Sequence, residues 1–140
     1  MYKKIIVPVS SRKSGERTRK ALAHARALCK GELVLLHVTE PLPNLVGGEA
    51  RMELKNDARA MGLTLLCPFL DELERAGIKF QTRVEEGNIA ETIVRIAHEE
   101  EADLIVMFTD GRDNLEDMLF GSITERVLRE TDTPLLAVRR

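Results

Sequence analysis

Aromatic side chains are scarce in this 140-residue chain, which has no tryptophan and a single tyrosine. Proteins that bind single-stranded nucleic acid by base stacking need several exposed aromatic rings. Lysine and arginine number 21 against 23 aspartates and glutamates, so the chain also lacks the basic excess that attracts a phosphate backbone. These two shortages exclude the usual modes of nucleic-acid binding, and we expect no nucleic-acid partner.

Long apolar runs and targeting signals are missing as well. No uninterrupted apolar stretch approaches the ~20 residues that cross a bilayer. The first eight residues carry two lysines but no apolar segment with a cleavage site, so they do not resemble a secretory leader. We therefore expect a cytoplasmic protein with no membrane partner.

Cysteine is used only twice, at Cys29 and Cys67, both within patterns that predict helix. Neither belongs to a CxxC pair or has zinc-site spacing to a histidine, which predicts two reduced thiols and no metal. His37 lies inside an apolar run and is interpreted as a hydrogen-bonded core residue. Because no serine or cysteine has a base at a recognisable spacing, we expect a protein that is not an enzyme.

Two kinds of apolar pattern alternate along the chain. Continuous β-branched runs predict strands buried on both faces, and apolar residues at 3.6-residue spacing predict helices between them. Strands are predicted at residues 4–9, 33–38, 78–84, 104–108 and 134–138, with helices opening near Ser14, Glu49, Asn88 and Ser122. Unlike the continuous runs, residues 78–84 alternate apolar and polar side chains, which suits a strand nearer the edge of the sheet. This alternation predicts one α/β domain over residues 1–140, with a parallel, doubly wound sheet and helices on both faces.

Glycine, proline and capping residues set the expected helix ends. The first helix is expected to stop at Gly31 and the long second helix at Gly77. Pro68 lies inside the second helix and predicts a kink or break near Leu65. The last two helices open with capping-box spacings, Asn88 with Glu91 and Ser122 with Glu125.

The loop before the last helix is a candidate ligand site. Gly111 is followed by nine residues and then by Gly121-Ser122. Backbone N–H groups at a helix N-terminus attract phosphate. A purely structural interpretation has equal weight, in which Gly111 permits a turn and Ser122 caps the helix. Acidic residues around Arg112 would oppose a polyphosphate unless a divalent cation lay between them: Asp110, Asp113, Glu116 and Asp117.

Segments along the whole chain resemble the universal stress protein family. Residues 4–9 and 35–38 resemble its first two strands, residues 86–93 the entry to its third helix, and residues 102–107, 111, 121–122 and 133–138 its ending. The resemblance implies a five-stranded sheet of order 3-2-1-4-5. It also implies a stress-response protein that acts by binding a protein partner still to be identified. A homodimer is implied through the final strand, at Pro134, Leu135, Leu136, Ala137 and Val138.

Family members that bind ATP share a sequence motif in this region. It consists of a glycine, two residues, a glycine, nine residues, a glycine and then serine or threonine. Gly111, Gly121 and Ser122 match its later part, whereas Phe108 stands at the first glycine. Ser10 follows the first strand, where ATP binders tend to have aspartate. Phe108 would either point into the core or fill the volume that a nucleotide needs.

The same resemblance assigns three more residues to a nucleotide site: Pro8, Ile123 and Val38, with Val38 against the adenine. The first interpretation is a stress-response dimer without tight ATP binding. The alternative is a sensor that binds ATP or AMP, with magnesium, through the loop from Gly111 to Ser122.

Overall fold

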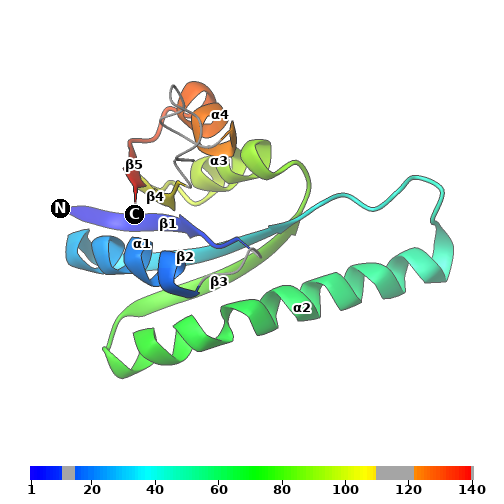
Figure 1. Cartoon of the computed structure of the whole chain (residues 1–140), viewed down its shortest axis with the longest axis horizontal. Coiled ribbons are helices and arrows are strands. Elements are labelled where there is room, and N and C mark those ends of the chain that lie inside the picture. Colours follow the sequence, from blue (N-terminus) through cyan, green and yellow to red (C-terminus); the bar gives the residue numbers. More distant parts are fainter. Residues whose placement is uncertain (11–14, 110–121, 140) are drawn as a thin grey trace.

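Strands and helices alternate along the chain in the computed structural model, which describes residues 1–10, 15–109 and 122–139. Figure 1 shows a central sheet flanked by helices. In the described ranges the elements are β1 (Tyr2–Pro8), α1 (Gly15–Leu28), β2 (Cys29–Thr39), α2 (Gly48–Arg75), β3 (Lys79–Glu86), α3 (Ile89–Glu99), β4 (Leu104–Phe108), α4 (Ser122–Glu130) and β5 (Leu135–Val138).

The five strands form one parallel sheet in the order β3-β2-β1-β4-β5, which confirms the predicted fold. β1 lies at its centre, where Ile5 pairs with Leu33 of β2 on one side and Leu104 of β4 on the other. β3 and β5 form the edges, as the alternating pattern of β3 and the family resemblance predicted. Because helices cover both faces, the central strands are apolar on both sides.

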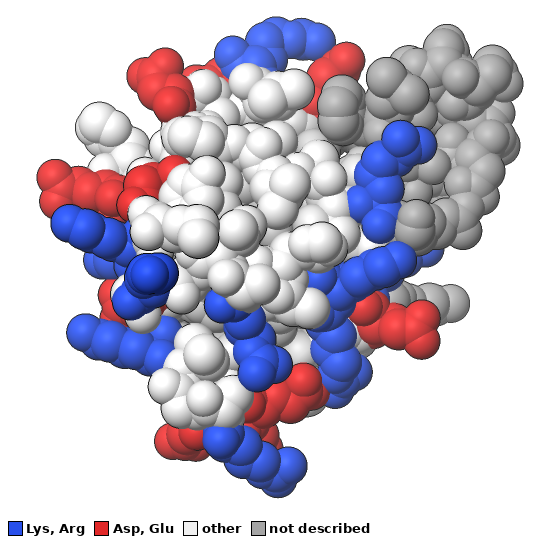
Figure 2. All heavy atoms as spheres, turned by 90° about the vertical axis from the view of Figure 1, so that its left-hand side faces the viewer, with Lys and Arg blue, Asp and Glu red and all other residues white. Residues whose placement is uncertain are grey.

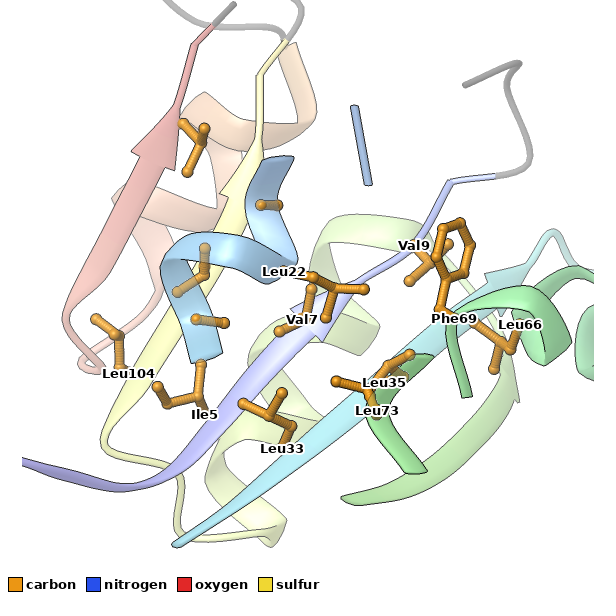
Figure 3. Packing of buried hydrophobic residues seen from close by; sticks show 14 of the residues in the cluster. Ile5, Val7, Val9, Leu22, Leu33, Leu35, Leu66, Phe69, Leu73 and Leu104 are labelled. Atoms are coloured by element: carbon orange, nitrogen blue, oxygen red, sulfur yellow. The ribbon is translucent and has the colours of Figure 1, made fainter. Parts of the chain in front are cut away.

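Each face of the sheet has its own hydrophobic cluster. α1 and α2 pack on one face through residues such as Leu22, Leu66 and Phe69, which meet Val7 and Leu35 of the strands (Figure 3). α3 and α4 pack on the other face, where Ile93, Ile96 and Val127 meet Ile6, Val34, Leu36, Val38, Ile105 and Met107. Burying one such Leu, Ile or Val side chain contributes roughly 1.5–3 kcal/mol.

The predicted end of the first helix at Gly31 is wrong. α1 ends at Leu28, and β2 begins directly at Cys29, so Cys29 is a strand residue. A Cβ atom on Gly31 would lie 2.1 Å from the carbonyl oxygen of Lys3, beside the irregular register of β1 and β2 between Tyr2 and Lys4. The glycine therefore permits a close approach of two strands, a role that sequence patterns do not distinguish from a helix stop.

Of the predicted kink or break near Leu65, the break is wrong, because α2 is one continuous helix of 28 residues with Pro68 inside it. Proline removes the hydrogen bond to the carbonyl of Thr64. Pro68 and Thr64 are both exposed, so water can satisfy that carbonyl. The helix ends at Arg75, and Gly77 follows with φ of 71°, which confirms the predicted stop.

Capping differs between the last two helices. Asn88 caps α3, where the Glu91 N–H donates to its side chain at 3.0 Å, as predicted. α4 begins at Ser122, so this residue is the first of the helix and not the capping residue before it. The Glu125 side chain pairs with Arg129 at 3.5 Å. The final strand begins at Leu135, one residue after the predicted Pro134.

Candidate functional site

The strand order reverses at β1, whose neighbours are β2 on one side and β4 on the other. In open parallel sheets, ligands bind beyond the carboxyl ends of the strands at such a reversal. The described residues there include Pro8 at the end of β1 with Val9 after it, Val38 in β2, and Phe108 at the end of β4 with Thr109 after it. These residues define the candidate site, which we call the β1/β4 edge.

Hydrogen bonds hold the β1/β4 edge in place. The N–H of Val9 donates to the carbonyl of Leu36 at 2.7 Å, and Nδ1 of His37 lies 2.8 Å from the carbonyl of Val9. His37 is only 8% exposed, so the prediction of a hydrogen-bonded core histidine is confirmed. On the other side, the N–H of Thr109 donates to the carbonyl of Val138 at 2.9 Å. The strand ends therefore form a rigid platform.

Pro8, Val38 and Phe108 do not share one face of the sheet. Side chains alternate between the faces of a strand. Val38 belongs to the cluster under α3 and α4, and Pro8 has the same orientation as Ile6 of that cluster. Phe108 instead packs against the cluster under α1 and α2. Two of the predicted nucleotide-site residues therefore share one face of the sheet, and the phenylalanine ring points to the opposite side.

Arg17 lies over the Phe108 ring, with its guanidinium carbon 5.5 Å from the ring centroid. The arginine belongs to the first turn of α1, which begins at Gly15. The phenylalanine is the last residue of β4 and is half-buried. Sequence reasoning missed Arg17, because no periodic pattern links a residue of α1 to one in β4.

Ser122 and Ile123 are the first two residues of α4 and are exposed. The first N–H groups of a helix have no partner inside the helix and can bind an anion. Gly111 and Gly121 lie outside the described residues, as do the acidic residues near Arg112. Ser122 and Ile123 are therefore the residues of the predicted phosphate loop that the structure describes. They lie at the start of α4, which covers the same face of the sheet as Val38.

A second group of polar residues lies at the carboxyl end of β3. The carboxylate of Glu86 accepts from the N–H of Leu42 at 3.1 Å and lies 3.6 Å from Nζ of Lys55 and 3.9 Å from Arg51. The Leu42 N–H and the two cations hold the pKa of Glu86 below its ordinary value. This arrangement connects the segment after β2 to α2.

A cluster of ion pairs around Glu100, the residue that follows α3, joins β1 to β3. Lys4 and Arg83 contact Glu100 at 3.1 and 2.9 Å. Burial raises the pKa of Glu100, but hydrogen bonds from both cations outweigh it, so the pKa lies below its ordinary value. Because these charges pair with one another and join two strands to the end of α3, we assign the cluster to stability.

Similarity to known proteins decides the family. The model of the universal stress protein family matches residues 1–139. The chain belongs to the universal stress protein family. It is 31% identical over 156 aligned positions to universal stress protein MJ0577 of Methanocaldococcus jannaschii, covering all of this chain and 96% of the relative. A solved structure of MJ0577 superimposes with a TM-score of 0.81 and 35% identity, covering 100% and 97% of the two chains.

More distant family structures share the fold alone. A universal stress protein in complex with cAMP has a TM-score of 0.69 at 20% identity, with 98% and 97% coverage. A family protein from Arabidopsis thaliana with AMP bound has a TM-score of 0.69 at 17% identity, with 99% and 92% coverage. The family assignment makes this chain a stress-response protein.

In the ranges that the structure describes, no helix combines the length and apolar content needed to cross a membrane. Within the same residues, no group of three or more His, Cys, Asp and Glu side chains could hold a metal ion.

Proposed function

We propose that this universal stress protein acts in the cytoplasm by binding, without turnover, and that its ligand at the β1/β4 edge is an adenine mononucleotide. The observation that carries the proposal is the division of side chains between the two faces. Pro8, Val38 and the start of α4 lie on one side, and Phe108 packs on the other. The Phe108 ring is thus directed away from Val38, the residue that resembles the adenine contact of the family.

The charge of the neighbouring sequence favours one phosphate over three. Residues 110–117 contain four acidic side chains and one arginine, and Ser10 replaces the aspartate typical of ATP binders. Like charges repel, and ATP carries more negative charge than AMP or cAMP. Tight ATP binding is therefore not expected. The cAMP and AMP in distant family structures support the same ligand class.

Binding without turnover is supported by the position of His37. Its Nδ1 is engaged by the Val9 carbonyl, and the side chain is buried. A general base must instead reach the proton that it removes. We therefore assign His37 a structural role at the strand ends and not the role of a general base.

The nucleotide proposal is tested by thermal unfolding with AMP, cAMP or ATP and magnesium. At a concentration of 100 times Kd, a bound ligand stabilises the protein by about 2.7 kcal/mol. We expect this response for AMP or cAMP at lower concentrations than for ATP. Gly121→Val should abolish it, whereas Gly47→Val, at a position with no atom within 4 Å of an added Cβ, should not. A flat response to all three nucleotides at millimolar concentration would leave only a protein partner as the ligand.

The free edge of the sheet supports the second part of the proposal, a homodimer through β5. The carbonyls of Pro134 and Val138 accept hydrogen bonds of 2.9 Å from β4. Because backbone groups alternate along a strand, those of Leu135 and Ala137 point away from β4, to the free edge. An unpaired edge invites pairing with a second strand. A two-fold axis would pair β5 with its own copy.

Figure 2 shows the side of the molecule that lies at the left in Figure 1, where β5 and the start of β1 are found. Uncharged residues occupy its centre, and charged side chains surround them. Leu135, Leu136 and Ala137 are only half-buried in the single chain. An uncharged surface with a charged rim is typical of a protein interface.

Sedimentation equilibrium at micromolar concentration tests the dimer. Ala137→Pro removes an N–H group from the free edge and none from the β4 pairing, so we expect a monomer that remains folded. Thr131→Pro is not a suitable control because its N–H bonds to Val127. Glu130→Gln, at the end of α4, is suitable and should remain dimeric. A wild-type monomer would overturn this part of the proposal.

A further inference from the structure

We propose that the first half of α2, residues 48–61, is a docking surface for a basic amphipathic helix of a partner protein. Figure 1 shows this half of the helix extending past the sheet, on the side of the molecule away from β5. No residue within it is buried. It includes none of the residues that define the β1/β4 edge, and it lies away from the edge strand of the proposed dimer.

Exposed apolar side chains gather on this half of α2 and beside it. Eight large apolar side chains are exposed among the described residues, and three of them, Met1, Ile123 and Leu128, lie elsewhere in the chain. The other five lie within residues 45–63, at Leu45, Met52, Leu54, Met61 and Leu63. A gathering of this kind marks an interaction surface, whereas single exposed apolar residues are normal. Methionine suits such a surface because its flexible side chain adapts to a partner.

The spacing of apolar residues favours a helix as the partner. Four of them follow one another at intervals of four, three and four residues: Leu54, Ala58, Met61 and Leu65. With this spacing a helix presents one apolar stripe to a second helix. The stripe starts at exposed Leu54 and ends at Leu65, which packs against the cluster under α1 and α2. A partner helix along it would extend the core beyond the sheet.

The basic residues of this half are already engaged by the chain itself. Arg51, Lys55 and Arg59 lie at intervals of four residues and so form one row along the helix. Arg51 and Lys55 pair with the Glu86 carboxylate, and Arg59 donates to the carbonyl of Val84. The basic row is therefore directed toward β3.

The acidic residues form a second row and have no such contacts. Glu49, Glu53 and Asp57 also lie at intervals of four residues, two positions before the basic row, which places them on the opposite side of the helix. All three are exposed, and they form no ion pair with any residue that the structure describes. Like charges at this spacing destabilise a helix. Lysine or arginine from a partner would relieve that repulsion.

The acidic row also disfavours two other occupants of the surface. In an antiparallel pair formed by two copies of this chain, the acidic row of one copy would lie beside that of the other. An anionic membrane would repel the same three carboxylates. Charge complementarity therefore favours a basic protein helix over both.

The test uses a synthetic peptide of about 18 residues, long enough to form a helix, with leucine at alternating intervals of four and three residues and lysine on its other faces. Fluorescence anisotropy of the labelled peptide gives its Kd for the full chain without nucleotide. We expect binding that weakens as salt is raised. The same composition in scrambled order, or glutamate in place of lysine, should raise the Kd at least about tenfold.

Two double variants test the stripe and the acidic row separately. Leu54→Gln with Met61→Gln removes two exposed apolar anchors and should raise the Kd for the lysine peptide at least about tenfold. Glu53→Lys with Asp57→Lys should raise it about tenfold and allow the glutamate peptide to bind. Loss of structure alone would not produce this exchange of preference.

The matched control changes the same charges in the second half of α2. Asp71 and Glu74 are exposed, so Asp71→Lys with Glu74→Lys alters the net charge equally and should leave both Kd values unchanged. Hydrogen exchange should show that the lysine peptide protects residues 48–61. Circular dichroism establishes that each variant is folded.

The proposal is overturned if wild type fails to bind the lysine peptide at millimolar concentration, or if all variants bind it as wild type does. A lower sedimentation mass of Leu54→Gln with Met61→Gln would instead identify a second copy as the occupant. Wild-type binding to phosphatidylserine vesicles that this variant lacks would identify a membrane, and either result overturns the proposal. Because the titrations contain no nucleotide, this inference and the nucleotide proposal can fail independently.

Discussion

The two halves of α2 are stabilised in different ways. In the second half, Gly62, Leu66, Phe69 and Leu73 are buried against the sheet. In the first half, residues 48–61, no residue is buried, and Met52 and Met61 are 66% and 72% exposed. Figure 1 shows this half extending past the end of the sheet. One continuous helix thus contains a core element and a nearly solvated one.

Polar contacts hold the first half of α2. Lys55 and Arg51 pair with Glu86 of β3, and Arg59 donates to the carbonyl of Val84 at 3.5 Å. Arg51 also donates to the carbonyls of Pro43 and Val46, at 3.0 and 2.9 Å. Exposed ion pairs contribute little compared with buried apolar side chains. The comparison teaches that helix continuity does not imply equal stability along its length.

The largest expected change in the free energy of unfolding comes from a substitution in the buried half of α2. Leu66→Ala should destabilise the protein by about 2–5 kcal/mol, because Leu66 is fully buried and the change leaves a cavity. Met61→Ala, five residues earlier on the exposed half, should change the free energy of unfolding by no more than about 0.5 kcal/mol. Urea unfolding measures both. Equal losses would mean that the first half is covered in solution, for example by a partner.

Pro68 provides a stabilising change within the same helix. Pro68→Ala restores the N–H that can bond to the Thr64 carbonyl and improves helix propensity, so we expect a gain of about 1–3 kcal/mol. Cys67→Ala, at the preceding exposed residue, is the control and should have little effect. Lower stability in Pro68→Ala would show that α2 is adapted to the proline.

The smallest expected change in the free energy of unfolding comes from removing the ion pairs that hold the first half of α2. Glu86→Gln removes the charge and keeps an acceptor for the Leu42 N–H, so we expect a loss of about 1 kcal/mol or less at about pH 7. Hydrogen exchange should rise in residues 48–61 and stay unchanged in the second half of α2.

The pH dependence of the free energy of unfolding tests whether Glu86 acts through its charge. The folded-state pKa of Glu86 is lowered, by the Leu42 N–H and then by Lys55 and Arg51. Its contribution is therefore present above the unfolded-state pKa and disappears as pH falls through the folded-state value. The difference between wild type and Glu86→Gln should vanish in acid. A difference that persists at low pH would show that Glu86 acts through its shape and not its charge.

Sequence patterns predicted most of the fold, whereas the nucleotide site stays a prediction. The apolar runs of β1, β2 and β4 indicated buried strands, and Asn88 and Gly77 marked helix boundaries that the structure confirms. The family resemblance assigned Pro8 and Val38 to one nucleotide site. It could not show the direction of the Phe108 side chain or its contact with Arg17, because these depend on how α1 packs across β4.

Local chemistry determined which segments of this chain became strands and helices, because alternation, burial and capping act over a few residues. Packing between distant segments decided the rest. Gly31 became a point of close approach because Lys3 of β1 lies against it, and Pro68 remained within a helix because its side faces solvent. Phe108 became a support for Arg17 because α1 packs over the end of β4. Contacts of this kind join residues far apart in the chain, and no local pattern records them.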